Sequence, residues 1–302
     1  MSRAWNYRLT TTSKLSDEYD EAPWRQKITQ QIATALQERK EWTLARWLKP
    51  DDMQFGRDVR LLDYACGTGS ITKALGPWVS VVRGIDVSES MVNKFNEAAR
   101  SSGLKPETVN AVVGDLLADE VPDHLNTAEY YDFDVAVIGL GFHHFENPVL
   151  AVERIAERLK PANGVLLVID FLPFDQDEHG NEMSKTIKTS GFARSNMEKL
   201  YKIAKLDKFS FSVIDDPAVM ELQEGTKKRT MFVARGIRQP TMWGKIANWV
   251  YDMQMEASKQ TSHNYQNNDT KGQGLGMFGE TYQVKPSNEG FALPERPERK
   301  EQ

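Results

Sequence analysis

The segment from residue 61 to residue 70, Leu-Leu-Asp-Tyr-Ala-Cys-Gly-Thr-Gly-Ser, constrains the fold of this chain more than any other feature. An apolar run leads into two glycines and then into a helical pattern, which predicts a strand, a tight turn and a helix. Because glycine lacks a Cβ atom, Gly67 and Gly69 would let a ligand approach the backbone closely. The free N–H groups at the start of the helix suit an anionic group. The segment predicts a site for a small, partly anionic ligand, with a purely structural turn as the alternative.

Two well-known glycine-rich loops do not fit this segment. The dinucleotide-binding fingerprint requires a third glycine where this chain has Thr72, and the phosphate-binding loop G-x-x-x-x-G-K-[ST] does not occur. The string from Asp63 to Gly69 instead resembles the first motif, D/E-x-x-x-G-x-G, of class I S-adenosylmethionine (SAM)-dependent methyltransferases. This resemblance implies SAM-binding roles for Asp63, Ala65, Cys66, Gly67 and Gly69, with the two glycines against the amino-acid portion of SAM.

A second acidic position follows the second predicted strand. Asp86 lies 19 residues after Gly67, close to the offset of about 20 at which a carboxylate accepts hydrogen bonds from ribose hydroxyls. The resemblance implies that Asp86 binds the ribose of SAM and that Val87 belongs to the same site. The family's Ser-x-x-Met element matches Ser88 and Met91, which implies a helix cap at Ser88 and an adenine contact at Met91. Without a ligand, Asp86 is an ordinary acid at the start of a helix.

A third acidic position follows the third predicted strand, in Val-Gly-Asp115-Leu116. The family uses this acid and the adjacent backbone N–H to recognise adenine, so the resemblance implies this role for Asp115 and Leu116. Either acid alone would be unremarkable in a loop. Two acids at the carboxyl ends of strands in one α/β sheet favour a shared site, because ligands bind at that edge.

The fourth predicted strand ends at Gly139 in a loop that carries His143 and His144. The resemblance places Gly139 in the SAM site and the histidines beside the methyl group that is transferred. Histidine is the side chain most easily poised as a base near neutral pH, so His143 or His144 is a candidate catalytic base. The alternatives are that they shape the pocket, or that they ligate a metal with Glu146, for which no third protein ligand is evident. We therefore expect no metal site.

Strand and helix patterns alternate from residue 58, which predicts βαβ units and a parallel sheet. The expected strands are 58–63, 80–85, 109–113, 133–138, 164–170, 208–214 and 229–235. The expected helices are 69–76, 88–101, 146–160 and 194–204. Together with the resemblance, this order implies an α/β, Rossmann-like, doubly wound sheet of seven strands. The sheet would be mostly parallel, with an antiparallel last strand and helices on both faces.

The two ends of the chain differ from this central region. A flexible tip is expected over 1–15, followed by a methyltransferase domain over 16–238 that begins with a helix from Pro23 to Leu48. The resemblance implies that this helix closes over the ligand. Apolar residues at helical spacing predict an amphipathic helix over 239–261, and a polar composition predicts disorder over 262–302. A protein partner could bind through 240–302.

Composition narrows the function further. The hydrophobic share of 40% and the charged share of 27% are those of a globular protein, and the net charge of −5 provides no bulk attraction for nucleic acid or anionic membranes. The single cysteine excludes an intrachain disulfide. No secretory signal is visible, so we expect a cytoplasmic protein, with a mitochondrial presequence as the weaker interpretation.

The resemblance implies a SAM-dependent methyltransferase that acts by direct displacement on an O, N, S or C nucleophile of a small molecule. The chain lacks both the [N/D]-P-P-[Y/F] element of amino-directed nucleic-acid enzymes and the paired-glutamate loop of protein arginine enzymes. Methylation of a protein or RNA, a non-catalytic assembly or regulatory role, and a nucleotide-dependent oxidoreductase remain as alternatives.

Overall fold

The structure is a computed structural model that describes residues 22–49, 57–175, 187–222 and 225–242, together with 244, 246, 249–251 and 253–255. The chain divides into two units, Met1–Asn248 and Trp249–Gln302. The predictions for 1–15 and 262–302 lie outside the described residues.

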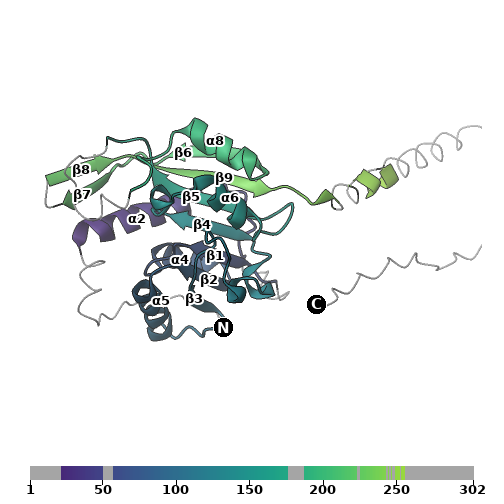
Figure 1. Ribbon diagram of the computed structural model, residues 1–302, viewed down its shortest axis with the longest axis horizontal. Coiled ribbons are helices and arrows are strands. Elements are labelled where there is room, and N and C mark those ends of the chain that lie inside the picture. The colour runs from purple at the N-terminus through teal and green to yellow at the C-terminus, as the bar shows by residue number, and fades with distance from the viewer. Residues whose placement is uncertain are drawn as a thin grey trace, which may run out of the picture. The chain divides into compact units, whose positions relative to one another are not determined.

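Seven strands of the first unit form one sheet in the order β3-β2-β1-β4-β5-β9-β6 (Figure 1). Five of them run parallel: β1 (Arg60–Tyr64), β2 (Val81–Asp86), β3 (Val109–Val113), β4 (Val135–Gly139) and β5 (Val165–Phe171). The strand β9 (Met231–Arg238) runs antiparallel to β5 and to β6 (Leu206–Val213). The predicted seven-stranded, mostly parallel sheet is confirmed.

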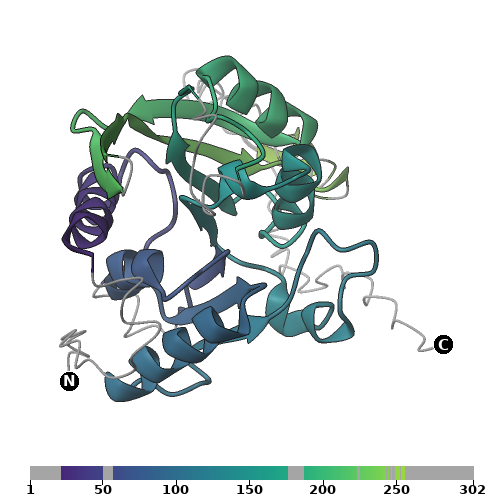
Figure 2. The same cartoon turned by 60° about the vertical axis from the view of Figure 1, so that its left-hand side comes forward.

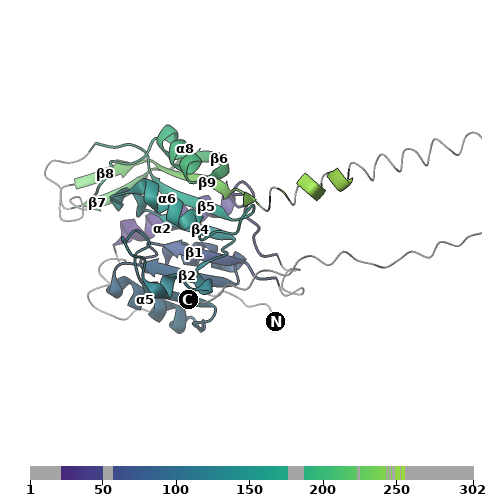
Figure 3. The same ribbon diagram turned by 45° about the vertical axis from the view of Figure 1, so that its right-hand side comes forward.

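Helices cover both faces of this sheet, which explains why its central strands are almost entirely buried. All seven residues of β5 are buried, because a strand covered on both sides has no solvent-facing positions. One face carries α2 (Pro23–Glu38), α4 (Ser70–Leu75) and α5 (Glu89–Ser101). The other carries α6 (Pro148–Ala156) and α8 (Arg194–Ile203), as Figure 3 shows. Short 3-10 turns form η1 (Gly76–Trp78), η2 (Asp123–Leu125), η3 (Ala128–Tyr130) and η4 (Phe142–His144).

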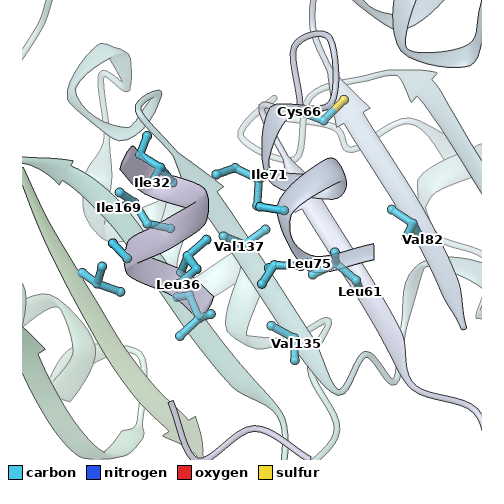
Figure 4. Packing of buried hydrophobic residues seen from close by; sticks show 14 of the residues in the cluster. Ile32, Leu36, Leu61, Cys66, Ile71, Leu75, Val82, Val135, Val137 and Ile169 are labelled. Carbon is cyan, nitrogen blue, oxygen red and sulfur yellow. The ribbon is translucent and has the colours of Figure 1, made fainter. Parts of the chain in front are cut away.

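The first helix, α2, packs against the sheet and contributes to its hydrophobic core. Its side chains Ile32 and Leu36 are buried between the sheet and α4, where Figure 4 shows them near Val137 and Ile169. The predicted helix to Leu48 was too long, because α2 ends at Glu38. The apolar stripe stops at Leu36, and the backbone beyond the helix is no longer helical. The predicted helix 146–160 was likewise too long, since α6 spans nine residues.

A hairpin between β6 and β9 was missed by the sequence analysis, which predicted no strand between residues 214 and 229. The strand β7 (Ala218–Leu222) pairs antiparallel with β8 (Gly225–Arg229). The sequence of β8, Gly-Thr-Lys-Lys-Arg, has no apolar residue and therefore gives no alternating signal. The hairpin contacts α2, and Figure 2 shows the purple helix beside the green hairpin. The side-chain amide of Gln31 donates to the carbonyl oxygen of Pro217 at 3.4 Å, which links the two elements.

Beyond β9, the described residues from Met242 to Met255 are helical. Their apolar side chains are exposed: Met242 by 77%, Trp249 by 62% and Met253 by 52%. Within the described ranges, no helix has the length and apolar character that crossing a membrane requires.

Candidate functional site

The turn after β1 adopts a strained backbone that suits its glycines. Ala65, Gly67 and Gly69 all have positive φ angles, of 57°, 51° and 87°. A Cβ atom on Gly67 would meet no atom within 4 Å, so this glycine borders open space. A Cβ atom on Gly69 would lie 2.9 Å from Cδ2 of Phe95, so this glycine lets α5 pack against the turn. The two glycines therefore differ, and Gly67 is the one that leaves room for a ligand.

Asp63, in the strand that leads into this turn, is a buried acid. The residue is 1% exposed, and its Oδ2 accepts hydrogen bonds from the backbone N of Thr72 at 3.1 Å and from its Oγ1 at 2.7 Å. Its Oδ1 is buried and has no hydrogen-bond partner in the described part of the chain. Burial raises the pKa of Asp63 to about 7, although the hydrogen bonds from Thr72 oppose this. A buried acceptor without a donor is costly, so the site suits a ligand that brings a donor.

Asp86, at the end of β2, joins two turns. Its Oδ2 accepts from the backbone N of Gly67 at 2.8 Å, and its Oδ1 accepts from the backbone N of Ser88 at 2.9 Å. The Ser88 hydroxyl in turn caps α5 by accepting from the backbone N of Met91. Val87 is 70% exposed and offers an apolar surface at this position. Each carboxylate oxygen keeps further acceptor capacity for a ligand hydroxyl.

Asp115, after β3, is linked to the first strand by Tyr64, which the sequence analysis missed. Its Oδ1 accepts from the Tyr64 hydroxyl at 2.9 Å and from the backbone N of Leu117 at 2.7 Å. The backbone N of Leu116 donates to the same hydroxyl at 3.2 Å. Burial, followed by the charge of Asp115, raises the pKa of Tyr64. The Leu116 N–H that the resemblance assigns to adenine is therefore engaged by Tyr64.

His143, in η4 after β4, is buried and bonded to Asp170 at the end of β5. Its Nδ1 lies 2.8 Å from Oδ1 of Asp170, and its backbone N donates to Oδ2 at 3.1 Å. Because an ionised carboxylate only accepts, Nδ1 carries the proton and Nε2 is left as the acceptor of a neutral ring. The ring of His144 lies 4.1 Å from that of His143, centroid to centroid. The sequence signal for Asp170 was a single acid in an otherwise apolar strand.

Three other candidates have contacts that the sequence did not reveal. Gly139 lets Ile71 of α4 pack against the end of β4, where a Cβ atom would collide with the isoleucine. Cys66 is buried, and burial raises the pKa of its thiol, which argues against a nucleophile. Glu146 pairs with Lys188 at 2.9 Å. No three His, Cys, Asp or Glu side chains gather as a metal site within the ranges described.

These residues share one edge of the sheet. Asp63, Asp86, Asp115, His143 and Asp170 come from the carboxyl ends of β1 to β5 or the turns that follow them. In open α/β sheets this edge is where ligands bind, at the point where strand order reverses. Here the reversal lies between β1 and β4, beside the Gly67 turn and the His143 turn. This edge thus carries four carboxylates and one histidine, groups that can accept hydrogen bonds.

Comparison with known proteins bears on the same region. Residues 61–162 match the family described as a methyltransferase domain. An uncharacterized methyltransferase of Schizosaccharomyces pombe is 32% identical over 154 residues, which cover 49% of this chain and 53% of that protein. A demethylmenaquinone methyltransferase of Staphylococcus aureus is 32% identical over 119 residues, or 38% of this chain and 44% of that protein. The chain thus spans about half the length of the curated relatives it matches.

Solved structures with a similar chain path were also found. The CurJ carbon methyltransferase has a TM-score of 0.48 at 13% identity and covers 74% of this chain and 57% of its own. The YcgJ protein of Bacillus subtilis has a TM-score of 0.46 at 17% identity and covers 61% of this chain and 93% of its own.

Proposed function

The chain contains a methyltransferase domain of the class I SAM-dependent type, and from this premise we propose that it transfers the methyl group of SAM to a small-molecule acceptor. When bound, SAM would supply a methyl group on a sulfonium for direct transfer to an acceptor nucleophile. The chain's own task is to position the two reactants, to exclude water and to receive a proton. One observation carries the proposal: Asp63, Asp86 and Asp115 lie at or just after the carboxyl ends of three neighbouring strands, and Gly67 in the first turn borders open space.

Asp63 fits the amino-acid portion of SAM. An ammonium group would supply the donor that Oδ1 lacks, and an ionised carboxylate beside it forms a charge-assisted bond. The space at Gly67 would receive the backbone-like end of the ligand without a collision. Ala65, Cys66 and Gly69 would shape this turn and would not contact the reacting atoms. Gly139, which has no side chain, would leave room for α4 to pack next to the turn.

Asp86 and Asp115 fit the nucleoside. The carboxylate of Asp86 is held by backbone N–H groups on two sides, which fixes its orientation for the two ribose hydroxyls. Val87 and Met91 follow it with apolar surface for adenine. Asp115 would accept from the adenine amino group, with Leu116 beneath it as a buried packing residue.

His143 fits the role of general base, with Asp170 as the residue that positions it. The bond from Nδ1 to Asp170 leaves Nε2 unprotonated in the neutral ring, the state that accepts a proton from an acceptor hydroxyl or amine. His144 would remain a neighbouring residue of the same loop. The small-molecule class is supported by the demethylmenaquinone methyltransferase among the relatives, whose name denotes such an acceptor.

The proposal is tested by incubating the full chain with labelled SAM and a cell extract, then separating the products by size. We expect label in the small-molecule fraction, and its loss with Asp86→Ala. The exposed Glu97→Ala on α5 is the matched control and should retain activity. Label only in macromolecules would replace the small-molecule acceptor with a protein or RNA. No label from well-folded protein that binds SAM would contradict catalysis.

A further inference from the structure

We propose that Arg229 forms an anion-binding subsite for an acceptor that carries a carboxylate or a similar oxyanion, an inference that rests on the proposed methyl transfer. Arg229 is the last residue of β8, in the hairpin that the sequence analysis missed. Neither the family match, which spans residues 61–162, nor any motif reaches this position.

The backbone holds Arg229 at the same edge of the sheet as the candidate site. Arg229 is paired with Ala218 of β7, which is fully buried. The next residue, Thr230, accepts a hydrogen bond at its carbonyl oxygen from the backbone N of Leu172, at 2.9 Å. Leu172 directly follows β5, so this hydrogen bond connects the end of β8 to the end of the strand that contains Asp170 and Phe171. The position of Arg229 is therefore set by main-chain contacts and does not depend on its side chain.

The guanidinium of Arg229 is stacked on two aromatic rings. Its Cζ lies 3.6 Å from the ring centroid of Phe174 and 5.5 Å from that of Phe171. Among the described residues, no hydrogen bond or ion pair engages its N–H groups, although the residue is partly buried. Stacking uses the flat face of a guanidinium and leaves the N–H groups on its edge available. Those N–H groups match the geometry of a carboxylate.

The carboxylate of Asp170 lies near Arg229 but accepts its hydrogen bonds from other groups. Asp170 is the one acidic group whose field raises the pKa of Arg229, against the larger lowering by burial. Its oxygens instead accept from Nδ1 and the backbone N of His143 and from the backbone N of Phe171. A partly buried cation whose donors meet no acceptor among the described residues is the feature expected of a site that receives an anion.

Phe171 connects this subsite to the candidate base. Its ring centroid lies 5.5 Å from that of His143, while Arg229 lies over the same ring. An acceptor with its nucleophile near His143 and its oxyanion near Arg229 would thus extend past one phenyl ring. A compact aromatic or aliphatic acid has these dimensions. The structural alternative is that Arg229 only covers Phe171 and Phe174.

The test uses the full chain saturated with S-adenosylhomocysteine (SAH), the demethylated product of SAM. Calorimetric titrations with benzoate and with its uncharged counterpart benzamide measure the preference for an anion. We expect benzoate to bind at least tenfold more tightly than benzamide, and Arg229→Gln to abolish this preference without changing the affinity for SAH. Arg229→Lys keeps the charge and should keep part of the preference.

The control is Arg194→Gln, an exposed arginine at the start of α8 whose Cζ lies 5.7 Å from the ring of Phe209. It removes a stacked guanidinium on the opposite face of the sheet and should leave the benzoate preference intact. Equal binding of benzoate and benzamide to the wild type, or a preference that survives Arg229→Gln, would overturn the subsite. Failure of SAH to bind the folded wild type would instead overturn the proposed function on which it rests.

Discussion

Nδ1 of His143 lies 2.8 Å from Oδ1 of Asp170, and both side chains are buried where β4 and β5 end. Asp170 also accepts a hydrogen bond from the backbone N of His143. One carboxylate therefore orients the imidazole ring and holds the turn that carries it. The contact selects the neutral tautomer with the proton on Nδ1. This geometry makes His143, rather than His144, the better candidate for a base.

Asp170→Asn should reduce kcat about 100-fold, because an amide can donate to Nδ1 and favour the tautomer that is protonated on Nε2. The affinity for SAM should not change. Separate measurement of kcat and of the affinity for SAM distinguishes catalysis from packing, because a disrupted site would lose both. His143→Gln should likewise lower kcat and leave the affinity for SAM unchanged. An unchanged kcat in His143→Gln would contradict the assignment of the base.

The pKa of Asp63 predicts how SAH binding depends on pH. The carboxylate has a pKa of about 7 in the folded protein, so it is mostly neutral at pH 6 and ionised at pH 8. An ammonium ligand pairs with the ionised form, so the affinity for SAH should rise between these values. Asp63→Asn should weaken binding and remove the dependence. Calorimetric titration at three pH values provides the measurement, and a flat wild-type profile would argue against contact with the ammonium.

The same residue predicts how stability depends on pH in the absence of ligand. Because burial raises the pKa of Asp63 from 3.8 to about 7, the folded state binds the proton more tightly than the unfolded state. Its contribution to stability is therefore fully present below pH 4 and is lost as pH rises to about 7. Asp63→Asn, which cannot ionise, should gain in Tm relative to the wild type between pH 5 and pH 8. A constant Tm difference across this range is the contrary result.

The two glycines of the first turn should respond differently to alanine. Gly69→Ala places a methyl group against Phe95 at a φ of 87°, so the free energy of unfolding should fall by about 1–3 kcal/mol. Gly67→Ala has room for its methyl group and a φ of 51°, so its loss should be about 1 kcal/mol. Gly67→Ala should weaken SAM binding more strongly, because the methyl group enters the proposed ligand space. Urea denaturation and calorimetry together test this, and the reverse ranking would place the ligand elsewhere.

The sheet was predictable because its signals are local. Each parallel strand is a short apolar run, and the turn at Gly67 and the cap at Ser88 are written in consecutive residues. The acids Asp86 and Asp115 could be found for the same reason, since they directly follow such runs.

The features that the sequence did not predict depend on contacts between residues that lie far apart in the chain. The bond between Tyr64 and Asp115 and the bond between His143 and Asp170 join segments 51 and 27 positions apart. The hairpin strand β8 is polar and is paired by its backbone, so it carries no apolar alternation. The position of Arg229 over two phenylalanines follows from that hairpin. Such features arise only when the fold brings the segments together.

The central claim is that SAM binds at the carboxyl edge of β1 and β2, and calorimetric titration of the full chain with SAM tests it most directly. The account predicts one site per chain, with binding at least tenfold weaker in Asp86→Ala and unchanged in Glu97→Ala. Absence of binding by well-folded wild-type protein, or equal affinity in Asp86→Ala, would contradict it.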